Sequence, residues 1–232
     1  MAVYDHQERE QIEDLKVWWN QWGGYLLVII MGILLVILSV QGWRMWNAQR
    51  SDAASTLYFA LSEAIDSEDA TRAKEAMAQL ADNYGSTGYA PRAALLYAEA
   101  LWSADKKDEA QTQLQWVIDR ASEDDLKQIA RYRLAELLID QQKYEDALRL
   151  LDAKHKPAYE ALYADLRGDA LFGAGRTDEA REAYQKALLK LSARESGSAY
   201  HNIVQIKLDG LGGPIDPIAA VSADISIEKK NP

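Results

Sequence analysis

The stretch ALYADLRGDALFGAGRTDEAREAYQKALL, residues 161–189, carries the pattern that decides the fold. It contains two runs of helix-forming residues, separated by the glycine-containing segment AGR at residues 174–176. Gly168 in the first run and Ala180 in the second allow two helices to approach closely, and Leu171 and Tyr184 fill the space beside them. Because strand-like alternation is missing, the stretch predicts a pair of antiparallel helices.

The pattern of the second run recurs twice upstream. The matching segments are KKDEAQTQLQWV (residues 106–117), KYEDALRLLDAK (143–154) and RTDEAREAYQKA (176–187). Their alanines, Ala110, Ala147 and Ala180, are 37 and 33 residues apart. A period near 34 residues is typical of tetratricopeptide repeats, in which each unit is a helix–turn–helix. A fainter unit covers residues 51–84 and precedes the three clearer ones.

These units predict an all-α fold. We expect a tetratricopeptide-like array of about four helical pairs over residues 44–209, closed by a capping helix near residues 196–208. From residue 210 the chain is punctuated by Gly and Pro and has no helical periodicity. Residues 210–232 are therefore predicted to be a flexible tail.

An uncharged segment precedes the array. Residues 17–43, between Lys16 and Arg44, contain no charged side chain. The almost purely apolar part, residues 23–43, would be about 31 Å long as a helix, which matches a hydrocarbon core of roughly 30 Å. We predict a transmembrane helix over residues 23–43. Tryptophans on both sides of it predict two aromatic belts at the membrane interfaces, formed by Trp18, Trp19, Trp22, Trp43 and Trp46.

A cleaved signal peptide explains this segment less well than a retained anchor. A signal peptide has a basic start, a shorter apolar core and small residues at its cleavage site. Here the start is acidic, and the bulky sequence GWRMWN, residues 42–47, follows the apolar run. Residues 1–22 are predicted to include a short amphipathic helix, or simply a helical extension of the anchor. Two positive charges lie near each end of the span, so charge does not predict its orientation.

Composition narrows the classes of function. Residues 51–232 carry 22 Lys and Arg against 31 Asp and Glu, so nucleic acid is not an expected partner. The chain has no cysteine, and its histidines, His6, His155 and His201, lie in three separate regions without ligand spacing. No phosphate-binding glycine motif is found either. We expect no enzymatic activity, no cofactor and no metal, although an enzyme with an unfamiliar site stays an open alternative.

Aligning the first helices of the pairs places similar residues at the same positions. One position is acidic in all three clearer units, the position three residues later is apolar, and another apolar position lies one turn earlier. Together they form a candidate protein-binding groove of Leu95, Glu99, Trp102, Tyr132, Glu136, Ile139, Asp169 and Phe172. Such a stripe suits segments that mix basic and apolar residues. The alternative is that the apolar row packs between neighbouring repeats and the acids are solvated surface.

The whole layout resembles a known family, the ancillary subunit of the bacterial Sec translocon. The resemblance rests on several short segments spread over residues 1–210: Ile12-Glu13-Asp14-Leu15-Lys16, Gly42-Trp43-Arg44 with Trp46-Asn47, Leu126-Lys127 through Arg133-Leu134-Ala135, Ala164-Asp165-Leu166-Arg167-Gly168-Asp169-Ala170-Leu171 and Gln205-Ile206-Lys207-Leu208. The tail after Gly210 departs from the family pattern, so nothing is carried over to it.

The resemblance implies a bacterial inner-membrane protein with a short cytoplasmic N-terminus and a periplasmic repeat domain. It also implies association with Sec translocon subunits and with a membrane-anchored periplasmic chaperone resembling a peptidyl-prolyl isomerase. The implied role is a non-enzymatic adaptor that passes emerging secretory polypeptides to chaperones. A scaffold or assembly factor for another envelope complex would have the same fold, and stays the alternative.

Overall fold

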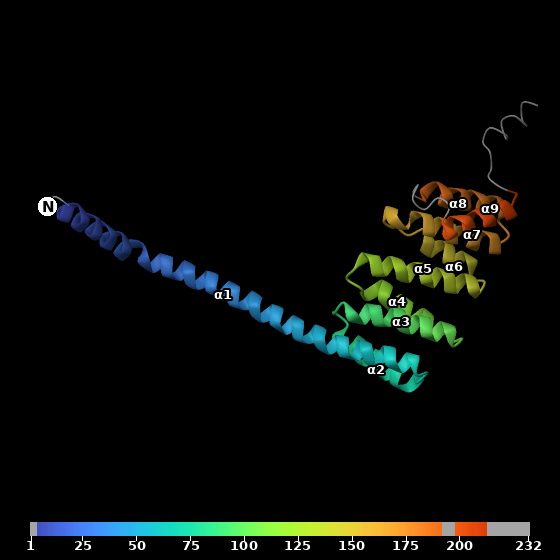
Figure 1. Ribbon diagram of the computed structural model, residues 1–232, viewed down its shortest axis with the longest axis horizontal. Helices are drawn as coiled ribbons and strands as arrows, with labels where there is room; N and C mark the ends of the chain where they lie inside the picture. Colours follow the sequence, from blue (N-terminus) through green and yellow to red (C-terminus); the bar gives the residue numbers. More distant parts are fainter. Residues whose placement is uncertain (1–3, 192–197, 213–232) are drawn as a thin grey trace, which may run out of the picture. The chain divides into compact units, whose positions relative to one another are not determined.

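A computed structural model describes residues 4–191 and 198–212, with side chains from residue 16 onward. The described backbone is helical throughout, apart from turns and loops (Figure 1). The elements are α1 (Tyr4–Asp66), α2 (Ala70–Tyr84), α3 (Tyr89–Ser103), α4 (Lys107–Arg120), α5 (Asp124–Asp140), α6 (Tyr144–Leu151), the 3-10 helix η1 (Pro157–Tyr159), α7 (Glu160–Gly173), α8 (Thr177–Lys190) and α9 (Ala199–Gly210).

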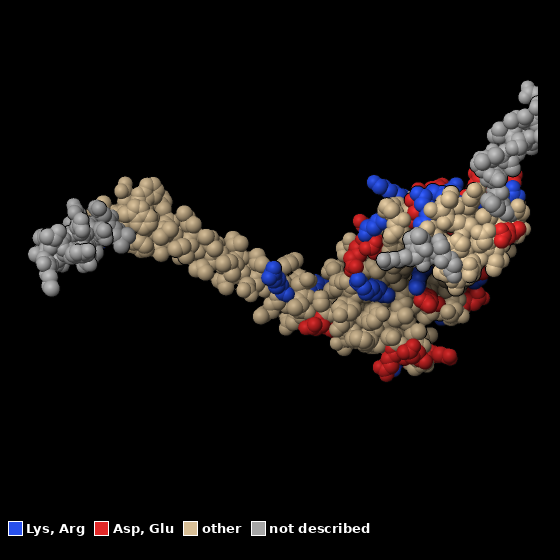
Figure 2. Space-filling model, turned by 45° about the horizontal axis from the view of Figure 1, so that its top comes forward, with Lys and Arg blue, Asp and Glu red and all other residues tan. Residues whose placement is uncertain are grey.

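The chain divides into two compact units, residues 1–53 and residues 54–232. The first unit belongs to α1, which contains one stretch long and apolar enough to cross a membrane. Its most apolar 18-residue window has a mean hydropathy of 2.7, and 6% of that window is buried within the protein. The large apolar side chains of this stretch therefore point outward, and Figure 2 shows it without charged residues. A helix of this kind fits a membrane anchor.

The second unit is built from consecutive helical pairs. The last turns of α1 lie beside α2 and contribute Leu61 and Ala64 to the same hydrophobic core (Figure 1). The later pairs are α3 with α4, α5 with α6, and α7 with α8. Small residues let the paired helices approach, and Ala110, Ala147 and Ala180 are fully buried. At Gly168 the approach is so close that a Cβ atom would overlap the ring of Tyr184.

The turn inside each pair is the same in all four units. Two residues after the first helix ends, the backbone adopts a positive φ, at Glu68, Asp105, Gln142 and Gly175. The amide of that residue donates a hydrogen bond to the carbonyl three residues earlier, as Asp105 does to Trp102 at 2.9 Å. The same turn follows α9, where Gly212 has a φ of 97° and donates to Asp209. Helix α9 therefore takes the place of a fifth first helix.

This architecture confirms the predicted all-α fold of four pairs and a capping helix. Ser198 caps α9 by accepting a hydrogen bond from the amide of His201 at 3.1 Å, and Val204 and Leu208 are buried. The boundaries expected at residues 22 and 43 fall inside α1, so they mark changes in composition along one helix. The flexible tail was predicted for residues 210–232, of which 213–232 lie outside the described residues. Side chains are not described for residues 4–15, which belong to the segment predicted to include a short amphipathic helix.

Candidate functional site

The predicted stripe lies along the first helices α3, α5 and α7, which contact one another in sequence. Cross-helix contacts between residues about 34 positions apart link these helices. Arg133 on α5 donates to Glu99 on α3 at 3.0 Å, and Tyr163 on α7 donates to the carbonyl of Gln128 on α5 at 2.9 Å. The structure thus brings equivalent positions of successive units together.

Most of the apolar row is packed into the array. Leu95 is buried, and Trp102, Tyr132 and Ile139 are partly buried against the hydrophobic core. Phe172 differs, because 55% of it is exposed. The row therefore contributes to packing between repeats at most positions and offers an apolar surface at its last one.

The acidic row is compensated by neighbouring groups rather than left open. Glu99 is exposed and pairs with Arg133. Asp169 accepts hydrogen bonds from the Tyr184 hydroxyl at 2.7 Å and from the Lys207 ammonium at 2.8 Å. Burial raises the pKa of Glu136 above its ordinary value, and a hydrogen bond with Tyr132 partly offsets this. Only the Glu99 end of the row faces water freely.

Sequence reasoning missed Asp165, which occupies the position of Leu95 and Tyr132 in the last unit. Asp165 is buried, with a relative exposure of 4%. It accepts hydrogen bonds from Lys207 at 2.9 Å and from the Tyr200 hydroxyl at 3.1 Å. Burial raises the pKa of Asp165, while the two hydrogen bonds act in the opposite direction. The signal was available in the sequence, because Asp165 lies four residues before Asp169 in a row that is otherwise apolar.

Lys207 is the second residue that sequence reasoning missed. It extends from α9 to both carboxylates of α7 and lies 5.6 Å from the centre of the Tyr184 ring. Burial alone would lower the pKa of this amine, but its hydrogen bonds to Asp169 and Asp165 outweigh burial and raise it. The capping helix thus supplies the counter-charge at the C-terminal end of the stripe.

A small cavity of about 270 Å³ opens within the stripe between α3 and α5. Its lining includes Glu99, Trp102, Arg133 and Glu136, so it offers both charges and an aromatic edge. Among the described residues, no group of three or more His, Cys, Asp or Glu side chains is placed to hold a metal ion. The groups present can bind a polypeptide through ion pairs and apolar contacts.

The five flanking tryptophans are exposed on α1. Trp43 and Trp46 lie with their ring centroids 5.3 Å apart, and the Arg50 guanidinium lies 4.7 Å from the centre of the Trp46 ring. On the other side of the apolar stretch, the ring centroids of Trp22 and Tyr25 lie 6.1 Å apart. Amphipathic rings at both ends of an apolar helix suit the two interfaces of a bilayer.

Comparisons with known proteins agree with this architecture. The chain matches the profile of the family described as tetratricopeptide repeat-like domain over residues 16–213, which includes both the apolar stretch and the array. It is 28% identical over 216 residues to a protein of Escherichia coli, covering 91% of this chain and 99% of the relative. It is 24% identical to a protein of Neisseria gonorrhoeae, covering 88% of this chain and 97% of the relative. Both relatives are named ancillary SecYEG translocon subunit, which confirms the resemblance seen in the sequence.

A solved structure supports the fold alone. The chain is similar to MamA, residues 41 to the end, from Desulfovibrio magneticus RS-1, with a TM-score of 0.50 and 19% sequence identity. The similarity covers 69% of this chain and 90% of that one.

Proposed function

The chain belongs to the tetratricopeptide repeat-like domain family, and we propose that it is a membrane-anchored ancillary subunit of the Sec translocon. One observation carries the proposal. Relatives that bear the name of this subunit align with about nine-tenths of the chain, so the apolar helix and the array are shared as one unit. A shared layout of anchor and array favours a shared place of action more strongly than a shared repeat domain would.

We further propose that the protein is a non-catalytic adaptor. Tetratricopeptide-like arrays commonly bind polypeptides, and the stripe offers groups suited to that task. Phe172 supplies an exposed apolar surface, and Glu99 supplies an exposed carboxylate. In this proposal the array receives secretory polypeptides and passes them to a membrane-anchored periplasmic chaperone resembling a peptidyl-prolyl isomerase. The N-terminus is then cytoplasmic, and the array lies in the periplasm beside the inner membrane.

Affinity purification of the full-length protein from detergent-solubilised bacterial membranes tests the place of action. The translocon proposal expects Sec channel subunits to co-purify in stoichiometric amounts. Purification with a different envelope complex and without Sec subunits would support the alternative, a scaffold for that complex.

Site-specific photo-crosslinking in living cells tests the adaptor role. A photo-reactive residue at Phe172 should yield adducts with secretory polypeptides or with the periplasmic chaperone. The matched control is the same residue at Glu75, which is exposed on the second helix α2. Adducts with cytoplasmic proteins alone would reverse the proposed orientation.

A further inference from the structure

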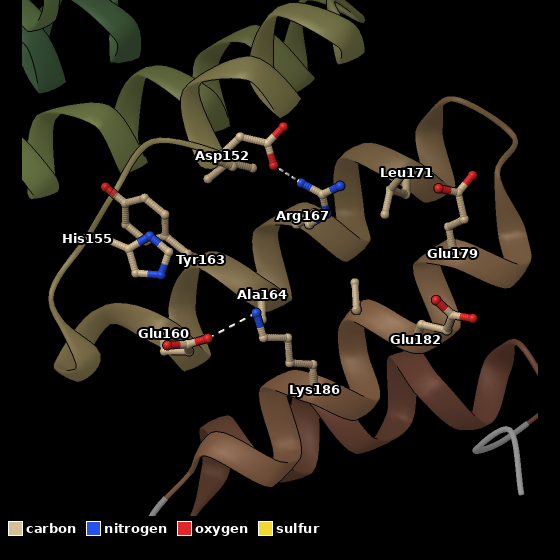
Figure 3. Close-up of a pocket in the computed structure, with 12 residues that line it drawn as sticks. Asp152, His155, Glu160, Tyr163, Ala164, Arg167, Leu171, Glu179, Glu182 and Lys186 are labelled. Carbon is tan, nitrogen blue, oxygen red and sulfur yellow. Dashed lines mark hydrogen bonds and ion pairs between the residues drawn. The ribbon is translucent and has the colours of Figure 1, made fainter. Parts of the chain in front are cut away.

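The second helix of the third pair is much shorter than its counterparts. Helix α6 has 8 residues, whereas α2 has 15, and α4 and α8 have 14 each. The missing residues would form about one and a half turns, or roughly 9 Å of helix. Beyond the end of α6, a cleft of about 420 Å³ opens on the flank of α7 and α8. We call it the α6 cleft, and its polar lining is Asp152, His155, Glu160, Tyr163, Arg167, Glu179, Glu182 and Lys186 (Figure 3).

The sequence itself accounts for this opening, because equivalent positions of α4 and α8 carry different residues. Trp116 on α4 and Lys186 on α8 each lie thirteen residues after the end of the first helix of their pair. Where the preceding second helix is complete, Trp116 packs beside Gly85, just past the end of α2. Where the preceding helix is short, Lys186 instead extends along the cleft and pairs with Glu160 at 2.9 Å. A polar residue at this position keeps the wall of the cleft open to water.

The charges of the cleft do not balance. Four carboxylates and two cations line it. Arg167 pairs with Asp152, Lys186 pairs with Glu160, and Glu179 accepts hydrogen bonds from Arg176 at 2.7 and 2.6 Å. Within the part of the chain that the structure describes, Glu182 takes part in no ion pair. The excess negative charge therefore lies at Glu182 on α8, which Figure 3 shows on the same side of the cleft as Glu179.

The floor of the cleft is apolar. It consists of Leu151, Ala164, Leu171 and Ala183, all of which belong to the core. The ring of His155 stacks on Tyr163, with the ring centroids 4.4 Å apart, and forms a flat wall on the side of the cleft away from Glu179 and Glu182 (Figure 3). A ligand that fills this space must present an apolar group to the floor and a cation to Glu182.

We propose that the α6 cleft binds a segment of a partner polypeptide in which a Lys or Arg side chain lies next to an apolar one. The proposal rests on the adaptor function and names a second surface for it, separate from the stripe. The volume of about 420 Å³ lies in the range of sites that hold small ligands, so it is large enough for a few side chains of such a segment. The ion pair between Glu182 and the Lys or Arg of the segment would be exposed to solvent. It would therefore select among segments more than it would strengthen binding.

A defined peptide tests this proposal with the full-length protein in phosphatidylcholine nanodiscs. The probe is a fluorescent twelve-residue peptide of alternating Leu and Arg, and two further peptides replace Arg by Glu or by Ser. Fluorescence anisotropy against empty nanodiscs measures the binding. The key variant is Glu182→Lys, and the matched control is Glu75→Lys, because Glu75 is exposed at the equivalent position of α2.

The Arg peptide should bind wild-type protein at least several times more tightly than the Ser peptide, and the Glu peptide least. Glu182→Lys should weaken binding of the Arg peptide about fivefold, because an exposed contact is lost and a repulsion replaces it. The affinity of Glu182→Gln for the Arg peptide should lie between those of wild type and Glu182→Lys. The affinity of Glu75→Lys should match that of wild type.

Equal effects of the Glu182 and Glu75 substitutions, or an Arg peptide that does not bind wild-type protein, would overturn the cleft proposal. Since no translocon component is present in this assay, such a result leaves the co-purification with Sec subunits unaffected. Failure of the two proposals can therefore be told apart.

Discussion

The ammonium group of Lys207 on α9 lies 2.9 Å from a carboxylate oxygen of Asp165 on α7, across 42 residues of sequence. Asp165 is a buried acid one helical turn before Asp169 on α7, and Lys207 also donates a hydrogen bond to Asp169. The capping helix is therefore held by charge as well as by the buried Val204 and Leu208. It also neutralises the Asp169 end of the stripe, whereas Glu99 at the other end is exposed and pairs with Arg133.

Replacing Lys207 should weaken the cap. Lys207→Met would leave Asp165 buried beside Asp169 without a counter-charge, so we expect unfolding free energy to fall by about 2 kcal/mol. Amide hydrogen exchange in α9 should accelerate before exchange in α5. Urea unfolding of the full-length protein in detergent, followed by circular dichroism, measures the first effect. Lys190→Met is the control, because Lys190 is exposed and lies 3.9 Å from Glu160. Equal losses for both variants would contradict the assigned role.

Adding one methyl group at Gly168 should also destabilise the array. A Cβ there overlaps the Tyr184 ring, and that ring is held by its hydrogen bond to Asp169. We expect Gly168→Ala to lower the unfolding free energy by about 1–3 kcal/mol. Gly210→Ala is the control, because a Cβ at Gly210 meets open space. A Gly168 variant as stable as the Gly210 variant would contradict this, because α7 and α8 could then move apart without a loss of unfolding free energy.

The dependence of stability on pH should distinguish a buried acid from a paired one. Burial raises the pKa of Glu136 in the folded state, so this residue makes stability fall as pH rises from about 4.5 through the raised pKa. Glu136→Gln removes this ionisable group, so the variant should gain stability relative to wild type as pH increases. Unfolding curves between pH 4.5 and pH 7.5 measure the change.

Glu123 provides the opposite case for this experiment. Its hydrogen bond with Arg92 lowers the pKa of Glu123, so its contribution is present above about pH 4.5 and is lost as pH falls through the lowered pKa. Glu123→Gln should therefore lose stability relative to wild type as pH rises through the range below about 4.5, so the unfolding curves for this variant extend below pH 4.5. If stability relative to wild type changed in the same direction with pH for both variants, Glu136 would not be the buried acid and Glu123 the paired one.

The sequence was sufficient to predict the pairs because small residues must lie where helices touch. Ala110, Ala147 and Ala180 repeat at nearly constant spacing, and each is buried against its partner helix. The length of α6 was not predicted, since the repeat pattern aligned residues 143–154 with the other second helices without giving their ends, and α6 ends at Leu151. Pro157 disfavours helical conformation in Lys156, so α6 could not continue through this point to the length of its counterparts, and η1 starts there instead.

The candidate site was harder to predict than the fold. Equivalent positions identified the stripe, but the ammonium group that pairs with Asp169 comes from Lys207 on α9, 38 residues further along the chain. Nothing in the local pattern around Lys207 distinguishes it from a solvated lysine. Asp165 departs from the apolar residues at the equivalent positions, Leu95 and Tyr132, and a buried acid is stable there only with Lys207 and Tyr200 in place.

The apolar stretch of α1 should determine whether the protein stays in the membrane. Ile33→Arg combined with Ile37→Arg places two cations near the middle of residues 23–43, at about 3 kcal/mol each on insertion scales. We expect this variant to leave the carbonate-resistant membrane fraction. The control is Phe59→Arg with Ile206→Arg, because both residues are exposed apolar side chains outside that stretch. The control should stay in the membrane fraction, so loss of both variants would point to misfolding, and retention of both would mean that another part of the chain holds the protein there.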